Sequence, residues 1–401
     1  MSSFEDSQSR LLFGYPELFE TSIPRRIFHE ETVELLSNIS AILLKSKEAK
    51  EYPDLISFAF WCRNSSIYQL SRKYVGTSNR IGLGTVLHIT PKNVPMNFAF
   101  SWALSSLAGN RNLVKLPTND FKQVEFFLNT LLNLSNEKRF ANTLSSNLFF
   151  KTERSSGLLR QLTLSSEARM LWGHSETIKY FRSFEVNPRH IDFAFPSRYS
   201  VALLSSKIFL ESTSGERNII AQKFIKDALT FGQRGCSSPR IVFWLGESHL
   251  SDLARQDFWD LVSNLVPRYL ENSDYFARFA NLAQSALRGL INPDLNLDFQ
   301  KTLVNFQSKS PLMNGLEQVL SLGTFQEIKV DSPREFLSFL DRSVQTVTYF
   351  GIDPELLLEA IIEYGISGVD RIVPLGSAFD FSPIWDGVDL VSALSRVVEI
   401  R

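Results

Sequence analysis

The chain has 401 residues, of which 44% are hydrophobic and 21% are charged, and this balance is typical of a globular protein whose length predicts two domains. Lys and Arg together number 42 and Asp and Glu number 43, so the net charge is near zero and gives no electrostatic basis for binding nucleic acid. Two cysteines in so long a chain argue against a disulfide framework, no apolar run reaches the roughly 20 residues of a membrane span, and the first residues are polar and acidic, so we expect a cytoplasmic protein without a membrane span.

The first 80 residues predict an N-terminal helical segment. Leu35, Leu36 and Ile39 begin an apolar stripe at helical spacing within residues 30–74, and Pro53 interrupts it. Beyond residue 80 the helical spacing gives way to short apolar runs between turn residues. This change indicates that a sheet begins there.

A strand, a helix and a second strand are predicted next. The run that begins at Gly84 is a short buried strand that Pro91 closes, and the next strand is expected over residues 112–117. The helix between them, residues 96–107, is followed by Gly109, which suits a left-handed cap. Two strands joined by a crossover helix in so few residues indicate a parallel sheet.

The alternation of strands and helices continues along the rest of the chain. Further strands are predicted over residues 168–172, 200–205, 240–245 and from 327, and helices from Ser175, over 215–230 and within 252–290. Ser175 is also the expected N-cap of its helix. The whole pattern predicts an α/β fold.

The stretch Phe231-Gly-Gln-Arg-Gly-Cys-Ser-Ser-Pro-Arg240 places Cys236 in a glycine-flanked turn between a helix and a strand. Glycines let neighbouring backbone N–H groups converge on a bound oxygen, and the positive charge of Arg234 and Arg240 favours a thiolate over a thiol. Two interpretations stay equally open at this point. Cys236 is either a nucleophile or a small apolar residue of the core.

Two ordered motifs point to a family. Gly84-Thr-Val-Leu-His-Ile-Thr-Pro-Lys-Asn-Val-Pro95, followed by Leu107-Ala-Gly-Asn-Arg-Asn-Leu-Val-Lys-Leu-Pro117, resembles the aldehyde dehydrogenase superfamily. Within it the chain is similar to the LuxC-type acyl-CoA reductases, and the resemblance runs from about residue 39 to the end. The motifs that carry this closer resemblance are Trp172-Gly-His-Ser-Glu-Thr-Ile178, Gln233-Arg-Gly-Cys-Ser-Ser-Pro239, Asp370-Arg-Ile-Val-Pro-Leu-Gly376 and Trp385-Asp-Gly387.

The resemblance implies a variant dinucleotide-binding domain with a parallel sheet, together with a second α/β catalytic domain. The expected limits are 1–80 for a helical segment packing on the cofactor domain, 81–205 for the NADP-binding domain, 206–370 for the catalytic domain and 371–401 for a C-terminal segment. The active site is expected in the cleft between the cofactor and catalytic domains, where pockets commonly form.

The resemblance also implies the roles of individual residues. Cys236 becomes the nucleophile that takes the acyl group, and the side-chain amide of Asn93 with the backbone N–H of Cys236 stabilises the oxyanion that forms during transfer. Lys115 is expected to meet the adenosine ribose of NADPH or, with Thr118, its extra phosphate.

Further cofactor contacts are expected at two turns. Thr90 and Pro91, which close the first strand, are counted among the cofactor-binding residues. Gly173, His174 and Ser175 open a helix whose free backbone amides suit the cofactor pyrophosphate. An ordinary turn histidine is an equally good interpretation of His174.

The implied activity is NADPH-dependent reduction of an acyl-CoA or acyl-protein thioester to an aldehyde through a cysteine thioester. Residues 195–199, Phe-Pro-Ser-Arg-Tyr, carry no carboxylate where hydrolytic relatives hold the glutamate that activates water, and this favours reduction. Two alternatives are kept: a CoA-acylating dehydrogenase that works oxidatively, and an acyl-holding or scaffold protein that lost hydride transfer. The resemblance further implies a homo-oligomer and an acyl-protein synthetase as partner.

No metal site is predicted, because the remaining histidines stand without carboxylate or cysteine partners at metal-ligand spacing. A glutamate that would bind the nicotinamide ribose is not evident, although Glu327 lies in a suitable stretch. Trp385-Asp-Gly387 is expected to form a structural or subunit-contact turn.

Overall fold

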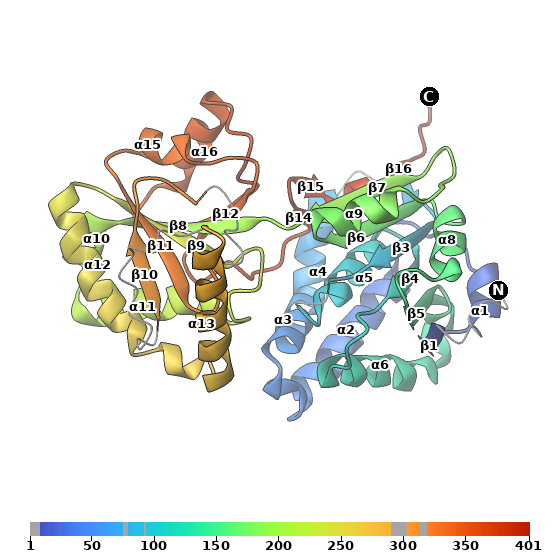
Figure 1. Ribbon diagram of the computed structural model, residues 1–401. Helices are drawn as coiled ribbons and strands as arrows, with labels where there is room; N and C mark the ends of the chain where they lie inside the picture. Colours follow the sequence, from blue (N-terminus) through green and yellow to red (C-terminus); the bar gives the residue numbers. More distant parts are fainter. Residues whose placement is uncertain (1–8, 75–78, 92–93, 290–302, 313–318) are drawn as a thin grey trace. The chain divides into compact units, whose positions relative to one another are not determined.

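The computed structural model describes residues 9–74, 79–91, 94–289, 303–312 and 319–401 (Figure 1). The chain divides into two compact units. The first comprises Met1–Pro196 together with Phe381–Arg401, and the second comprises Ser197–Asp380. The C-terminal residues therefore return to the unit in which the chain began.

The first unit is built on a sheet that is parallel apart from its first strand. Its described strands are β1 (Ser9–Phe13), β3 (Thr85–Ile89), β4 (Arg111–Lys115), β5 (Asn147–Thr152), β6 (Ala168–Gly173) and β7 (Ile191–Pro196), and their order is β1-β5-β4-β3-β6-β7. The chain adds β4 and β5 on one side of β3 and then returns to add β6 and β7 on the other. This reversal creates a topological switch point between β3 and β6, and open α/β sheets bind ligands beside the carboxyl ends of the strands at such a point.

Helices cover both faces of this sheet (Figure 1). On one face α1 (Pro16–Thr21), α8 (Gly157–Leu164) and α9 (Ser175–Arg182) pack over the leucines of β3, β4, β5 and β6. On the other face α5 (Asn97–Leu107) and α6 (Lys122–Ser135) contribute aromatic rings that meet Phe149 of β5 edge to face. Alternate residues of each strand point to opposite faces, so one short strand supplies both layers.

Further helices complete the first unit. They are α2 (Glu30–Lys45), η2 (Ala49–Glu51), α3 (Pro53–Trp61), α4 (Asn64–Ser71), η3 (Arg72–Tyr74), η4 (Lys138–Phe140), α7 (Ala141–Leu144) and α17 (Leu390–Ala393). α2 packs against both α5 and α6, and α17 packs against α5. The helical N-terminal segment that the sequence predicts thus forms a layer over the α5 side of the sheet.

The end of α5 is fixed by Gly109 and Asn110. Gly109 has φ +90°, and the carbonyl of Arg25 lies where a Cβ would stand, so this position requires glycine. The Asn110 side chain accepts a hydrogen bond from the Gly84 N–H (3.1 Å) and donates to the Leu394 carbonyl (2.8 Å). One asparagine therefore ties the end of α5 to the start of β3 and to the C-terminal residues.

The second unit has an all-parallel sheet. Its described strands are β8 (Tyr199–Ser205), β9 (Pro239–Leu245), β10 (Val304–Gln307), β11 (Thr324–Val330), β12 (Val344–Phe350) and β13 (Arg371–Pro374), in the order β10-β11-β9-β8-β12-β13. One face is covered by α10 (Ser206–Glu211), α11 (Ser214–Leu229) and α12 (Ser248–Ser263). The other face is covered by α13 (Asn272–Leu287), α15 (Pro333–Ser338) and α16 (Pro354–Glu363), and η5 (Val266–Arg268) follows α12. Burial on both faces explains the nearly continuous apolar runs of the central strands.

Two short ladders hold the C-terminal residues in the first unit. β2 (Arg80–Gly82) pairs with β16 (Ser395–Val397), and β14 (Ile384–Trp385) pairs with β15 (Val388–Asp389). The second pair is a hairpin whose turn residues, Asp386 and Gly387, both have positive φ. The Trp-Asp-Gly motif therefore forms a tight hairpin turn.

The predicted α/β fold class with parallel sheets is confirmed, whereas three local expectations differ from the structure. β8, which the sequence analysis assigned to the cofactor domain of residues 81–205, pairs with β9 and β12 in the second sheet. Residues 371–380 belong to the second unit, and only 381–401 return to the first. His174, not Ser175, is the N-cap of α9. Among the described residues, no helix combines the length and hydrophobicity that a membrane crossing requires.

Candidate functional site

The turn that carries Cys236 lies between α11 and β9, at the amino end of the second sheet. Ser200, near the start of the central strand β8, donates a 2.7 Å hydrogen bond from Oγ to the Cys236 carbonyl oxygen. The same Oγ accepts a hydrogen bond from the Thr346 N–H of β12 (3.2 Å). The backbone at the cysteine is therefore attached to two neighbouring strands.

Gln233 holds the first part of the turn. It is fully buried and has φ +62°, a conformation that is uncommon for a residue other than glycine. Its amide nitrogen donates to the carbonyls of Pro239 (3.3 Å) and Thr324 (3.1 Å), and its Oε1 accepts from the Gly323 N–H (2.9 Å). The sequence analysis missed this residue, because these partners are revealed only by the fold.

The two glycines of the turn serve different purposes. Gly232 has φ +57°, which favours glycine. Gly235 makes room for a ring, because a Cβ built on it would lie 2.8 Å from Phe379. Phe379 also meets Phe231 edge to face, with ring centroids 4.9 Å apart. The segment after β13 thus packs directly on the cysteine turn.

Asp227 of α11 anchors that segment. Its carboxylate accepts hydrogen bonds from the backbone N–H groups of Gly376 (2.6 Å) and Ala378 (3.0 Å). Burial raises the pKa of Asp227 to about 6, although these two hydrogen bonds oppose the rise. Lys226 adds a hydrogen bond to the Gly376 carbonyl (2.8 Å), so the end of α11 fixes the segment that covers the turn.

The two cysteines occupy contrasting environments, and neither forms a disulfide. Cys62 is completely buried, and burial raises the pKa of its thiol, which keeps it protonated and unreactive. Cys236 is only partly buried. The interpretation as a sealed apolar residue therefore describes Cys62 and not Cys236.

Three arginines lie around the turn. Arg234 is exposed and pairs with Asp274 (3.6 Å), and the buried Arg240 donates to the Leu320 carbonyl. The charges that the sequence analysis placed near Cys236 are therefore engaged in these contacts. Arg371, from β13, reaches the turn itself and donates to Ser237 Oγ (3.3 Å).

The predicted cofactor residues of the first unit lie together at the edge of its sheet that is formed by the carboxyl ends of the strands. The register pairs Ile89 of β3 with both Lys115 of β4 and Leu171 of β6, so these strands end side by side. Thr90 Oγ1 donates to the Lys115 carbonyl (2.7 Å). The residues that the structure places at this edge are Thr90, Pro91, Lys115, Gly173, His174 and Ser175. The edge includes the switch point between β3 and β6, where a parallel sheet is suited to bind a nucleotide.

Two predicted site residues are not in this group. Asn93 lies outside the described residues. Cys236 belongs to the second unit, whereas the residues of the β3, β4 and β6 edge belong to the first.

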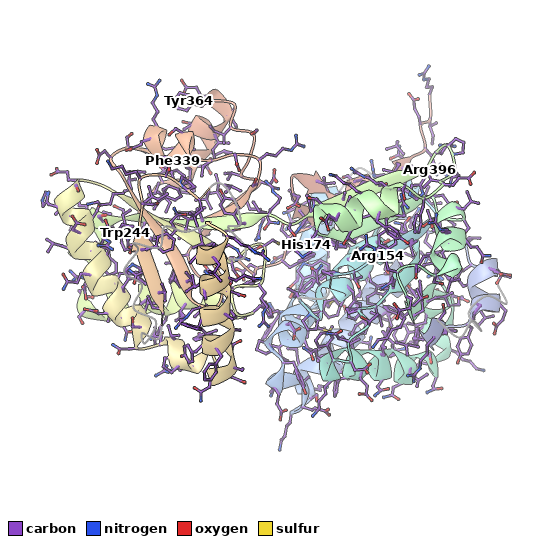
Figure 2. The ribbon with its side chains drawn as sticks, viewed as in Figure 1. Arg154, His174, Trp244, Phe339, Tyr364 and Arg396 are labelled. Atoms are coloured by element: carbon purple, nitrogen blue, oxygen red, sulfur yellow. The ribbon has the colours of Figure 1, made fainter. Side chains whose placement is uncertain are left out.

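The turn from β6 into α9 has the features of an anion site. Gly173 has φ +151°, which side-chain-bearing residues rarely adopt, and a Cβ built on it would lie 3.5 Å from the side chain of Thr177, an ordinary van der Waals distance. His174 is exposed at the start of the helix (Figure 2). The first N–H groups of an α-helix lack intrahelical acceptors and bind anions such as phosphates. The residues present therefore fit the phosphates of a dinucleotide.

A buried polar network lies beneath this edge. Trp172 Nε1 donates to Ser101 Oγ (3.3 Å), which is 2.8 Å from His88 Nδ1, and His88 Nε2 is 3.1 Å from Asn112 Oδ1. Burial lowers the pKa of His88 to about 4, so the imidazole is neutral. Trp172 also stacks on Phe195 with centroids 4.1 Å apart. The ring next to Gly173 is thereby held in one orientation.

Glu327 does not have the exposure that a cofactor contact needs. Its carboxylate is 1% exposed and accepts hydrogen bonds from Arg255 (2.8 Å), Asn305 (2.7 Å) and Trp244 (2.9 Å) within the second unit. It forms a buried ion pair with Arg255. Within the described part of the chain, no three His, Cys, Asp or Glu side chains form a group that could hold a metal ion.

The sequence matches the family model of acyl-CoA reductase (LuxC) over residues 62–268, just over half of the chain. No curated protein matches it. The fold is similar to aldehyde dehydrogenase 21 from Physcomitrella patens in complex with the reaction product succinate, at 11% identity and TM-score 0.64, covering 92% of this chain and 86% of that chain. It is also similar to NADP-dependent glyceraldehyde-3-phosphate dehydrogenase from Bacillus halodurans C-125 complexed with NADP, at 14% identity and TM-score 0.60, covering 92% and 85%. PnpE in complex with nicotinamide adenine dinucleotide is similar at 10% identity and TM-score 0.63, covering 90% and 80%. The molecule therefore has an aldehyde dehydrogenase fold.

Replacing Asp227 with Asn should make stability less dependent on pH. The folded state holds the Asp227 proton more tightly than the unfolded chain, whose reference pKa is 3.8, so this stabilisation is complete below pH 3.8 and is lost as the pH rises through 6. Relative to the wild type, the free energy of unfolding of Asp227→Asn should rise by about 2 kcal/mol between pH 4 and pH 7. Urea unfolding of both proteins at several pH values measures this difference.

Asp192→Asn is the control for that experiment. Burial alone would raise the pKa of Asp192, but hydrogen bonds from His190 and Arg169 outweigh it and lower the pKa to about 2. The Asp192 contribution is therefore complete above pH 3.8 and is lost only as the pH falls toward 2, so this control should show no rise between pH 4 and pH 7. An equally flat profile for Asp227→Asn would contradict the assignment.

Proposed function

This chain belongs to the acyl-CoA reductase (LuxC) family, and on that premise we propose that it reduces an activated acyl group to an aldehyde through a thioester on Cys236, with NADPH as the reductant. Its family and fold are those of oxidoreductases that act on acyl and aldehyde groups. The proposed acyl donor is acyl-CoA or an acyl-protein thioester. A homo-oligomer and an acyl-protein synthetase partner are part of the same proposal.

The observation that carries the proposal is the contrast between the two cysteines. Cys236 is partly exposed in a turn that hydrogen bonds of Ser200, Gln233 and Arg371 fix in place, whereas Cys62 is buried in the first unit. A nucleophile needs both access and a fixed position, and a covalent intermediate divides one difficult transfer into two easier steps. Cys236 alone meets both needs among the cysteines of the chain.

The proposed first step is acyl transfer to Cys236. The thiolate attacks the carbonyl carbon of the donor, the carbonyl electrons move to oxygen, and collapse of this oxyanion expels the donor thiolate and leaves the thioester. The side-chain amide of Asn93 and the backbone N–H of Cys236 are the proposed donors to the oxyanion, and the loss of one such donor typically costs about 10²–10³ in rate.

The proposed second step reduces the thioester. NADPH, when bound, would supply the hydride that reduces the thioester carbon. The oxyanion that forms on the acyl carbon then re-forms the carbon–oxygen double bond and breaks the carbon–sulfur bond, which releases the aldehyde and returns Cys236 as thiolate. Lys115 would hold the adenosine ribose or its phosphate, and Gly173, His174 and Ser175 would hold the pyrophosphate at the start of α9.

The segment between β7 and β8 supports reduction over hydrolysis. Within residues 195–199 the side chains are Phe, Pro, Ser, Arg and Tyr. Arg198 is directed to Asp370 and to the Val344 carbonyl. No carboxylate of this segment is available to activate a water molecule, so the thioester would persist until hydride arrives.

Incubation with a panel of acyl-CoAs should place an acyl adduct on Cys236, because the turn presents this thiol in a fixed position. Digestion and mass spectrometry locate the adduct. Cys236→Ala should abolish both the adduct and aldehyde formation. Cys62→Ala is the matched control and should retain both, since Cys62 is completely buried. An adduct that persists in Cys236→Ala would refute the assignment of the nucleophile.

Lys115→Met should weaken NADPH binding roughly tenfold or more, because a charge-assisted hydrogen bond contributes about 1.5–3 kcal/mol. NADH should be affected less if the lysine meets the extra phosphate. Titration of nucleotide fluorescence gives both dissociation constants. Lys329→Met is the control, since Lys329 pairs with Asp252 in the second unit. An unchanged dissociation constant for NADPH in Lys115→Met would argue against this site.

A further inference from the structure

Arg371 connects three segments around the cysteine turn. It is the first residue of β13 and is only 8% exposed. Its Nη1 donates to Ser237 Oγ (3.3 Å) and to the Ala378 carbonyl (3.0 Å), and its Nη2 donates to the Asp380 carbonyl (2.9 Å). The planar guanidinium group, with its fixed fork of donors, can hold several acceptors in one geometry where an ammonium group cannot.

Ser237, the acceptor in the turn, directly follows Cys236. It is 2% exposed and donates its single hydroxyl hydrogen to Gln345 Oε1 (3.0 Å). Its oxygen is therefore an acceptor toward Arg371. The chain of contacts from Arg371 through Ser237 to Gln345 fixes the residue next to the thiol from two strands.

Another attachment of the cysteine comes from β12 and the central strand β8. Thr346, which follows Gln345 in β12, donates its N–H to Ser200, and Ser200 donates to the Cys236 carbonyl. Cys236 is thus fixed through its own carbonyl and through the side chain of the next residue. Arg371 holds the second of these attachments and also the 378–380 segment, whose Phe379 packs on Gly235.

We propose that Arg371 is a positioning residue for Cys236, acting through Ser237 and the 378–380 segment to direct the thiol at the acyl carbonyl. This inference rests on the proposed function. In this positioning role Arg371 neither transfers a proton nor touches the acyl group. A displacement of a reacting group by 1 Å can cost about 10² in rate, so loss of this support affects the acylation step.

The test compares two reactions of the same thiol. Acylation by acyl-CoA needs an oriented attack, whereas alkylation by iodoacetamide needs only an accessible thiolate. In Arg371→Met the rate of acylation per folded molecule should fall about 10²-fold, while the rate of alkylation changes far less. Time courses of intact-protein mass spectra give both rates, and circular dichroism with a melting curve gives the folded fraction.

Two further variants keep the test informative if Arg371→Met folds poorly. Ser237→Ala removes one acceptor and leaves the other two contacts of Arg371, so acylation should slow by roughly fivefold, the effect of one hydrogen bond. Arg371→Lys keeps the charge without the fork and should acylate at a rate between those of the wild type and Arg371→Met.

Arg198→Met is the matched control. The Arg198 side chain is 9% exposed, in the same unit, and it contacts Asp370 and the Val344 carbonyl rather than Ser237 or the 378–380 segment. It should lose stability and still acylate at nearly the wild-type rate per folded molecule. Acylation of Arg371→Met within twofold of the wild type, or equal slowing in Arg198→Met, would overturn the inference alone. Absence of acylation in the wild type would remove the proposed function and this role with it.

Discussion

The hydrogen bond from Ser200 to the carbonyl of Cys236 is the contact on which the position of the proposed nucleophile depends. It joins the turn of the nucleophile to the central strand of the sheet, whose residues are buried on both faces. A turn attached to such a strand cannot move without disturbing the core. Gln233, Arg371 and the segment anchored by Asp227 then restrict the remaining freedom of the turn. The thiol is therefore partly exposed and still fixed in place.

The first unit is also built on a largely parallel sheet, but it carries the residues predicted to bind the cofactor. At its switch point the carboxyl ends of β3 and β6 lie side by side, and the residues predicted to bind the cofactor lie there. The polar network from His88 to Trp172 lies directly beneath and is neutral, so it orients the edge without adding charge to it. Lys115 and the start of α9 supply positive charge at this edge, which suits the phosphate binding that we propose.

Local signals in the sequence predicted much of this architecture. Pro91 and Gly109 delimit one strand and one helix by their own backbone geometry, so the first strand, helix and strand were read correctly. The assignment of β8 to the first domain was wrong, because the sheet that a strand joins is decided by its pairing partners. Arg371 and Ser237 are 134 positions apart, and no local pattern reveals their contact. The motifs of the site were thus visible in the sequence, whereas the contacts that hold them in place were not.

The central claim is that a thioester on Cys236 lies on the path to the aldehyde. The most direct measurement is a single turnover of acylated enzyme that has been freed of excess acyl-CoA and then mixed with NADPH. We expect that one NADPH is oxidised and one aldehyde is released for each acyl group, with the Cys236 thiol restored. A thioester that stays intact in the presence of NADPH, or that yields free acid while NADPH is unchanged, would contradict it.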